Sequence, residues 1–112
     1  MNTPELVTAL TDQLGLKLVA YLVRARESRV VRQWAQGTLV LANAQDIERL
    51  RLTLQAASLI TARESAAIAQ AWFQGLNPDL GDISPARLLR ENDIDIAGPA
   101  VLAAARQFAN SQ

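Results

Sequence analysis

The sequence predicts an all-α fold, and three observations support this. Apolar residues recur at spacings of three and four along most of the 112 residues, which is the period of helices buried on one side. The only β-like run is residues 38–41. Five Gly and four Pro are too few for a disordered or collagen-like chain. Half of the residues are apolar, so a chain of this length can bury a core made chiefly of Leu, Val, Ile and Ala.

The first two helices are expected on either side of a glycine. Thr3 offers an N-cap, and Pro4 suits the first helical position. Gly15 ends this helix, and a second one is expected over residues 16–23. The apolar residues that define the two helices are Leu6, Val7, Leu10, Leu14, Leu18, Val19, Leu22 and Val23.

A third helix is expected from Ser28, its N-cap, to Gly37, where the left-handed conformation favours glycine. At 100° per residue its polar and apolar residues fall on opposite sides, so one side is buried and the other is exposed. The polar side spans about 100° and consists of Arg29, Arg32, Gln33 and Gln36, and the apolar side consists of Val30, Val31, Trp34 and Ala35. Because Trp34 lies with the valines, we expect it to anchor the core rather than to stack on a ligand.

This basic helix pair is a candidate for DNA binding. Arg suits phosphates and guanine edges, and Gln can pair with adenine, so the third helix could enter the major groove as the second helix of a helix-turn-helix. Residues of the connection would then lie nearer the phosphates. The expected DNA-binding residues are Arg24, Arg26, Ser28, Arg29, Arg32, Gln33 and Gln36. The alternative is a solvated polar face, which is common on proteins that never bind DNA.

Residues 28–37 also resemble the helix-turn-helix of Xre-type regulators. In that family the recognition helix ends in Trp, two variable residues and Gly, which here are Trp34, Ala35, Gln36 and Gly37. The connection, residues 24–27, departs from the family pattern because it lacks the common glycine. The resemblance implies an N-terminal helix-turn-helix bundle, which we assign to residues 1–60.

A long helix is expected after Asn43. Its apolar stripe consists of Ile47, Leu50, Leu54 and Ala57. Thr61 and Glu64 have the spacing of a capping box, so the helix either breaks at Thr61 and restarts, or continues to Gln74. Both alternatives remain open. A chain this short can leave the stripe uncovered, which favours a homodimer; the alternative is that the stripe packs under the first two helices.

The C-terminal third contains a turn-rich segment and two expected helices. Residues 75–83 are rich in Gly, Asn, Pro and Asp. Ser84 and the proline after it start a helix that runs to about Glu91. Gly98 and the proline after it are expected to start the last helix, which ends near Ala109.

The segment 72–89 carries the most distinctive pattern. From the residues alone it is either a rigid connection between helices or a preorganised binding loop. A Trp, then Asn-Pro-x-Leu-Gly, then Ser-Pro-x-x-Leu-Leu is similar to the C-terminal toxin-binding domain of the MbcA/ParS/Xre antitoxin family. The matching residues are Trp72, Asn77, Pro78, Leu80, Gly81, Ser84, Pro85, Leu88 and Leu89.

This resemblance implies an antitoxin of a bacterial type II toxin–antitoxin system, with the matching residues binding the toxin. The usual partner is a RES-domain toxin that degrades NAD⁺. Antitoxins of this family typically form homodimers, cover the entrance of the toxin's active site, and repress transcription of their own operon. We therefore assign residues 61–112 to a small C-terminal helical toxin-binding region. The alternative is a stand-alone helix-turn-helix transcriptional regulator whose C-terminal region dimerises or senses a ligand.

The charges are segregated although they cancel overall. Residues 17–36 carry a net charge of +4, and residues 79–95 carry −3. The basic part suits a polyanion, and the acidic part suits a toxin with a basic nucleotide pocket; the alternative is two solvated faces. Asp93 and Asp95 therefore join the expected toxin-binding residues. An apolar patch on this surface is expected from Leu88, Leu89, Val101, Leu102 and Phe108.

The composition argues against an enzyme. The chain contains no Cys and no His, so disulfides, thiol nucleophiles, the usual general base and the commonest metal ligands are excluded. Asp93, Asp95 and Gly98 match three positions of a calcium loop, but Ala104 occupies the position of the required Glu. A hydrolytic carboxylate pair has no pocket signature. We expect neither a catalytic site nor a cofactor nor a metal.

The protein is expected in the cytoplasm. Its N-terminus has Asn2, Pro4 and Glu5 where a secretory signal would have basic and then apolar residues. The longest stretch without a polar side chain, residues 96–105, is much shorter than the roughly 20 residues that span a membrane. We therefore expect no membrane partner.

Overall fold

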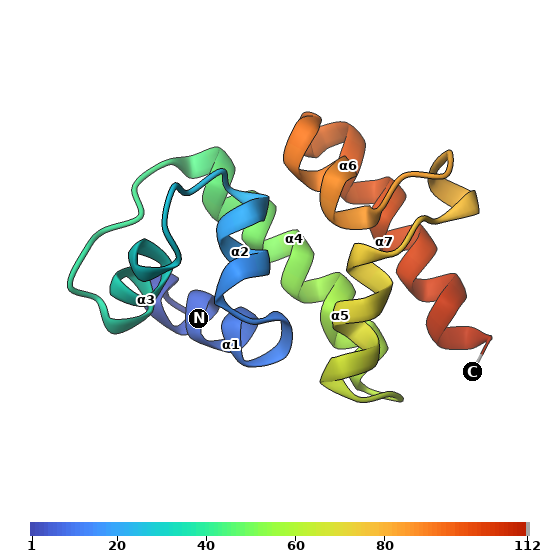
Figure 1. Ribbon diagram of the computed structural model, residues 1–112, viewed down its shortest axis with the longest axis horizontal. Helices are drawn as coiled ribbons and strands as arrows, with labels where there is room; N and C mark the ends of the chain where they lie inside the picture. Colours follow the sequence, from blue (N-terminus) through green and yellow to red (C-terminus); the bar gives the residue numbers. More distant parts are fainter. Residues whose placement is uncertain (112) are drawn as a thin grey trace.

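The computed structural model describes residues 1–111, which form seven α-helices and one short 3₁₀-helix (Figure 1). The only pairing of extended backbone within these residues is an isolated bridge between Asn77 and Ile83. The all-α prediction is therefore confirmed. The elements are α1 (Thr3–Leu14), α2 (Leu16–Leu22), α3 (Ser28–Gln36), α4 (Ala44–Thr61), α5 (Ala66–Gln74), η1 (Pro78–Leu80), α6 (Pro85–Glu91) and α7 (Ile94–Asn110).

Helix α4 runs diagonally through the molecule, with α1 to α3 on one side and α5 to α7 on the other (Figure 1). Its stripe is covered from both sides: Leu50 and Ala57 are fully buried, and Ile47 and Leu54 pack against the core. The stripe therefore packs internally, although α4 lies against α7 and α1 more than under α2, and the homodimer stays a prediction. The buried residues form one cluster that draws on both expected domains, 1–60 and 61–112, and the boundary between the two stays a prediction.

The N-terminal end of α1 differs from the prediction. Asn2, not Thr3, is the N-cap: its Oδ1 accepts from the backbone N of Glu5 at 2.9 Å. The Glu5 Oε1 in turn accepts from the backbone N of Asn2 at 3.0 Å, which completes a capping box. Pro4 lies in the first turn, where its missing N–H costs nothing. Gly15 ends the helix with a φ of 86°, as predicted.

The start of α3 also differs by one residue. Ser28 is the first helical residue, and Glu27 occupies the N-cap position without a side-chain hydrogen bond to the helix. Gly37 closes α3 in the left-handed conformation, with a φ of 77°, as predicted. Helix α4 begins after Asn43 as expected, and Asn43 is its N-cap, because its Oδ1 accepts from the backbone N of Asp46 at 2.9 Å.

The chain breaks after Thr61, which decides between the two alternatives for residues 44–74. The cap of α5 is Ser65, whose Oγ accepts from the backbone N of Ile68 at 3.2 Å. Thr61 instead donates its hydroxyl to Oε1 of Gln13, at 3.2 Å, and so ties α4 to α1. Of the two open alternatives the break is therefore the one observed, and the residue that restarts the helix is Ser65 rather than Thr61.

The last helix begins four residues earlier than predicted. Asp93 is the N-cap of α7, and Pro99 lies inside the helix. A proline in the sixth helical position removes one backbone hydrogen bond, and its ring crowds the carbonyl of the residue four positions earlier. Burial of the preceding turn against α4 opposes these costs. Ala97 and Gly98 are buried in this turn, and Ile94 packs against the core.

Gly98 allows α7 to approach α4 closely, and its replacement by valine is expected to destabilise the fold. A Cβ at this position would lie 2.5 Å from Cδ1 of Leu52. Alanine requires a shift of Leu52, and valine adds two more methyl groups, so Gly98→Val should lower the free energy of unfolding by about 1–3 kcal/mol. Urea denaturation followed by circular dichroism measures this change.

The control is Ala103→Val, which makes a similar change on the exposed side of α7. It should cost only the difference in helix propensity, about 0.5 kcal/mol. Equal unfolding midpoints for the two variants would show that the close packing at Gly98 contributes nothing.

Candidate nucleic-acid interface and partner surface

Helix α3 presents its polar side to solvent, as the sequence predicts. Val31 is fully buried, and the other apolar residues of the helix, Val30, Trp34 and Ala35, are half-buried. Trp34 packs against the core, in agreement with its expected role as an anchor. The exposed residues are Arg29, Arg32, Gln33 and Gln36, the four that were expected to share one arc.

The C-terminal end of this helix is held by its own backbone. The carbonyl oxygen of Gln33 accepts from the backbone N of Thr38 at 3.0 Å and from its Oγ1 at 3.3 Å. The Gln33 side chain remains exposed. The polar face of α3 is therefore carried on a helix that is fixed at its end and along its buried side.

At the start of α3, Arg29 forms an ion pair with Glu27, and both side chains are exposed. Exposed pairs contribute little, about 0–1 kcal/mol, so Arg29 can exchange Glu27 for a phosphate or a base at small cost. Arg26 is exposed in the connection before α3, and Ser28 is half-buried. Arg26 and Ser28 therefore come just before the polar face of α3 in the sequence.

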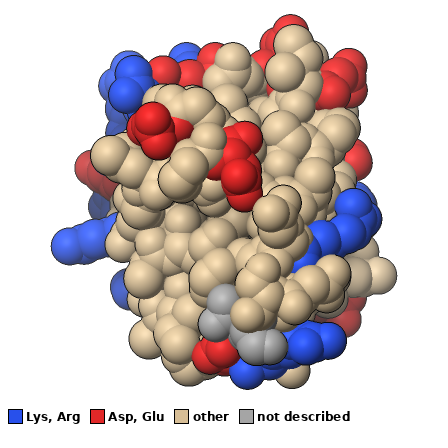
Figure 2. Space-filling model, turned by 90° about the vertical axis from the view of Figure 1, so that its right-hand side faces the viewer, with Lys and Arg blue, Asp and Glu red and all other residues tan. Residues whose placement is uncertain are grey.

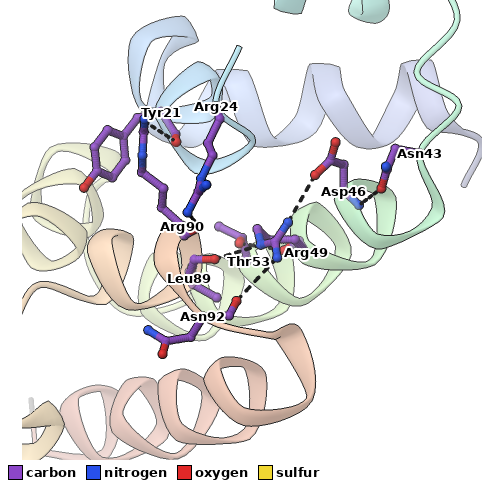
Figure 3. A network of polar contacts seen from close by, with 9 residues as sticks. All are labelled: Tyr21, Arg24, Asn43, Asp46, Arg49, Thr53, Leu89, Arg90 and Asn92. Carbon is purple, nitrogen blue, oxygen red and sulfur yellow. Dashed lines mark hydrogen bonds and ion pairs between the residues drawn. The ribbon is translucent and has the colours of Figure 1, made fainter.

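Arg24, which was expected near phosphates, is exposed and also contacts α6. Its Nη2 donates to the carbonyl oxygen of Arg90 in α6, at 3.1 Å, so the guanidinium is engaged with the C-terminal half of the chain (Figure 3). Its backbone is in the left-handed region, with a φ of 57°, a conformation that L residues other than glycine rarely adopt. Arg24 thus joins the connection before α3 to α6.

Sequence reasoning missed two further arginines of this network, Arg49 and Arg90. The side chain of Arg49 is only 13% exposed, and its Nη1 pairs with Asp46 at 3.1 Å. Its Nε donates to the carbonyl oxygen of Leu89 at 2.7 Å, and its Nη2 to that of Asn92 at 3.4 Å (Figure 3). These two carbonyls belong to the end of α6, which otherwise lacks partners for them. Arg49 therefore fixes α6 on α4.

Arg90 reaches in the opposite direction, toward α2. Its Nη1 donates to the carbonyl oxygen of Tyr21 at 2.9 Å, and its guanidinium lies 4.5 Å from the centre of the Tyr21 ring. A polar cleft of about 240 Å³ separates the connection after α2 from the end of α6. It is lined by Leu22, Val23, Arg24, Asp46, Arg49, Arg90, Glu91, Asn92 and Asp93.

The turn-rich segment between α5 and α6 is organised around Asn77. Its Oδ1 accepts from the backbone N of Asp79 at 2.9 Å, and its backbone N donates to the carbonyl oxygen of Ile83 at 3.1 Å. Its carbonyl oxygen accepts from the backbone N of Asp82 at 2.9 Å. Gly81 and Asp82 both have positive φ angles, 75° and 62°. The loop is thus internally bonded, which fits a connection between helices and a preorganised binding loop equally well.

Two aromatic residues at the end of α5 have different environments. Phe73 is fully buried, whereas Trp72 is half-buried. The Trp72 ring meets Phe73 edge-on, with ring centres 5.0 Å apart, and lies 6.2 Å from the Phe108 ring of α7. Phe73 therefore belongs to the core, and Trp72 lies at the edge of it.

The expected toxin-binding residues divide into three groups by exposure. Pro78, Gly81, Asp93 and Asp95 are exposed, and Trp72, Asn77, Leu80, Ser84 and Leu88 are half-buried. Pro85 and Leu89 are buried, so their side chains hold α6 in place and do not lie on the surface. Of the expected apolar patch, Leu89 and Val101 are core residues, whereas Leu88, Leu102 and Phe108 are half-buried.

Other apolar residues are exposed on this part of the chain. Leu76 is 76% exposed and Ile96 is 67% exposed, and the sequence analysis singled out neither. Leu76 follows Gly75, the C-cap of α5, and so lies outside the helix, where a helical period no longer indicates burial. The face formed by α7 and the segment 75–84 is mostly uncharged, with acidic side chains in its upper part and basic ones toward its edges (Figure 2).

Within residues 1–111 the structure offers neither a metal site nor a helix that could span a membrane. No three His, Cys, Asp or Glu side chains in this range gather where they could hold a metal ion. Among the helices of the same residues, none has both the length and the apolar character needed to cross a membrane. In comparisons with known proteins, no family model, no curated protein and no solved structure matches this sequence.

Proposed function

We propose that the protein binds operator DNA through the exposed face of α3. The observation that supports this is the division of α3 into a buried side at Val31 and an exposed side with two guanidinium and two amide groups. Arg and Gln are the side chains that pair bidentately with guanine and adenine in the major groove. Two copies related by two-fold symmetry would read two half-sites, so the proposal includes a homodimer on the operator.

We further propose that the protein is the antitoxin of a type II toxin–antitoxin pair and represses its own operon. The resemblance of residues 72–89 to the MbcA/ParS/Xre family supports this, with a RES-domain, NAD⁺-degrading toxin as the partner. The exposed carboxylates Asp93 and Asp95 can complement the basic pocket that a dinucleotide requires. Helix α3 and the C-terminal end of α7 lie at opposite ends of the molecule (Figure 1), whereas Asp93 at the start of α7 lines the cleft beside Arg24.

Loss of Arg29 or Arg32 is expected to weaken binding to the protein's own promoter. Removal of an arginine that contacts a phosphate reduces the steepness of log affinity against log salt by about 1, and it weakens binding to all DNA sequences equally. Gln33→Ala should instead cost about 1–3 kcal/mol on the operator and leave non-specific binding unchanged. Fluorescence anisotropy with promoter and unrelated duplexes, at several salt concentrations, measures both effects.

The matched control is Arg63→Ala, which removes one exposed positive charge beyond the end of α4, away from α3. Its affinity should equal that of the wild type. If Arg29→Ala and Arg32→Ala both bind the promoter as the wild type does, with unchanged circular dichroism, α3 is not the DNA-binding element. Copurification of the tagged protein with the product of a neighbouring RES-domain gene separates the antitoxin from the stand-alone regulator.

A further inference from the structure

The connection between α2 and α3 has a backbone conformation that its sequence does not favour. Arg24 has a φ of 57°, in the left-handed region where a Cβ is unfavourable. A residue in this region persists only where surrounding contacts hold it. The direction of α3 depends on this connection, because the two helices are separated by only residues 23–27. The contacts that hold Arg24 therefore act together with the packing of α3 on α1 and α2 in setting the direction of α3.

Part of this support is local, because the backbone N of Ala25 donates to the carbonyl oxygen of Ala20 at 2.9 Å and closes the end of α2 in a Schellman arrangement. The remaining contacts come from α6 and are reciprocal. Arg24 donates from its side chain to the backbone carbonyl of Arg90 at 3.1 Å, and Arg90 donates from its side chain to the backbone carbonyl of Tyr21 at 2.9 Å. The same Tyr21 carbonyl accepts from the backbone N of Arg24 at 3.3 Å. The Arg90 guanidinium also covers the Tyr21 ring. One residue of α6 thus contacts both ends of the turn that follows α2 (Figure 3).

The end of α6 is itself a fixed point. The mostly buried Arg49 of α4 binds the carbonyl oxygens of Leu89 and Asn92, the residues on either side of Arg90 and Glu91. Because α4 is the central helix, the connection before α3 is held against the core of the molecule. It is not a free surface loop.

Arg90 is badly placed to contact DNA itself. It is half-buried and engaged with Tyr21, and the cleft beside it is also lined by three carboxylates, those of Asp46, Glu91 and Asp93. Carboxylates near a guanidinium oppose the approach of a phosphate. Any effect of Arg90 on DNA binding must therefore pass through the connection between α2 and α3.

We propose that Arg90 is a positioning residue for DNA binding. By holding Tyr21 and Arg24, Arg90 fixes the connection that orients the exposed face of α3. Arg24 takes part in this contact with α6 instead of binding a phosphate. This inference rests on the proposed function of α3. According to this inference, α6 influences the affinity for DNA although it does not contact DNA and lies far from α3 along the chain.

The experiment compares Arg90→Ala, Arg24→Gly and the double variant with the wild type. Glycine at position 24 relieves the backbone strain and removes the side chain, so this variant should remain folded. The control is Arg87→Ala, which removes the same charge from α6 but affects only the exposed pair with Glu91. Promoter affinity is measured at several salt concentrations. Hydrogen exchange of the Arg24 and Ala25 amides, which donate to Tyr21 and Ala20, is measured without DNA.

Arg90→Ala is expected to weaken promoter binding about tenfold, which corresponds to 1.4 kcal/mol, with an unchanged salt slope. Arg24→Gly should also weaken it, and the double variant should bind less well than either single variant. The two changes remove different hydrogen bonds, from Arg24 Nη2 to the Arg90 carbonyl oxygen and from Arg90 Nη1 to the Tyr21 carbonyl oxygen. Hydrogen exchange of the two amides should become about tenfold faster in Arg90→Ala, because the same free-energy change makes opening of the connection about tenfold more frequent. Arg87→Ala should match the wild type in affinity and in exchange. Arg90→Lys, which keeps one donor toward Tyr21, should recover part of the affinity.

Two results would overturn the inference. A salt slope lowered by about 1 in Arg90→Ala or Arg24→Gly would identify a direct phosphate contact. Wild-type promoter affinity together with wild-type amide exchange in Arg90→Ala would show that Arg90 does not hold the connection between α2 and α3. If the alanine variant does not fold, the same measurements on Arg90→Lys decide the question. Absence of promoter binding by the wild type would instead overturn the proposed function, and the exchange rates would still report whether α6 holds the connection.

Discussion

Replacement of Phe73 by alanine is expected to lower the free energy of unfolding by about 3–5 kcal/mol, the range for buried aromatic residues. Phe73 is the largest of the fully buried side chains and lies where α5 meets the core. Domains of this size have unfolding free energies of about 5–15 kcal/mol, so the loss removes a large part of the total stability. Urea denaturation followed by circular dichroism, with the Trp fluorescence as a second probe, measures it.

The neighbouring residue provides the comparison. Trp72→Ala removes a ring that is half-buried at the edge of the core and loses its contacts with Phe73 and Phe108. We expect it to cost about 1–3 kcal/mol and to leave the chain folded. An equal or larger loss for Trp72→Ala would contradict the assignment of Phe73 as the core residue of this pair. The folded Trp72→Ala protein can then be used to ask whether Trp72 contacts a partner.

Much of the fold could be predicted because helix ends depend on neighbouring residues. Gly15 and Gly37 close their helices through their own backbone conformation, and Asn43 and Ser84 cap theirs through residues three positions away. Such signals are complete within a few residues of sequence. The start of α7 could not be predicted in this way, because the packing of Gly98 against Leu52 on another helix outweighs the local preference of Pro99.

The residues of the candidate sites could likewise be predicted where neighbouring residues determine their position, and not where distant residues do. The exposed face of α3 follows from helical periodicity, so the sequence predicted each of its four residues correctly. The contacts of Arg24, Arg49 and Arg90 join residues 40 to 69 positions apart, and nothing in the local pattern indicates them. The surface of α6 was predicted less well, since a helix packed on two sides buries Leu89 while it leaves Leu88 partly exposed.

The surface proposed for the toxin can be tested without removing any helix. Truncation after residue 77 would delete α6 and α7, which supply Leu89 and Val101 to the core, so the remaining chain would unfold. Single substitutions at exposed positions avoid this problem. Leu76 and Ile96 are the most exposed apolar residues of this part of the chain, and exposed apolar side chains are frequent centres of protein interfaces.

Leu76→Ser and Ile96→Ser are each expected to weaken toxin binding by about 2 kcal/mol where the side chain is central to the interface, which is roughly thirtyfold in Kd. The control is Val40→Ser, an equivalent change at a residue that is 79% exposed in the segment 37–43, on the opposite side of the molecule (Figure 1). It should inhibit like the wild type. The measurement is NAD⁺ consumption by the proposed RES-domain partner at a fixed concentration of this protein.

Reversal of the charges at Asp93 and Asp95 tests the electrostatic part of the same surface. If these carboxylates face a basic nucleotide pocket, replacing both with Lys should cost about 2–5 kcal/mol where they are buried on binding, and less at the rim. Lys in the first turn of α7 also disfavours the helix by about 0.3–1 kcal/mol per charge, so the double Asn variant, which removes both charges without reversing them, separates binding from folding. The Asn pair should inhibit less well than the wild type, and the Lys pair least. Full inhibition by the folded Lys pair and by both Ser variants would place the toxin contact elsewhere on the chain.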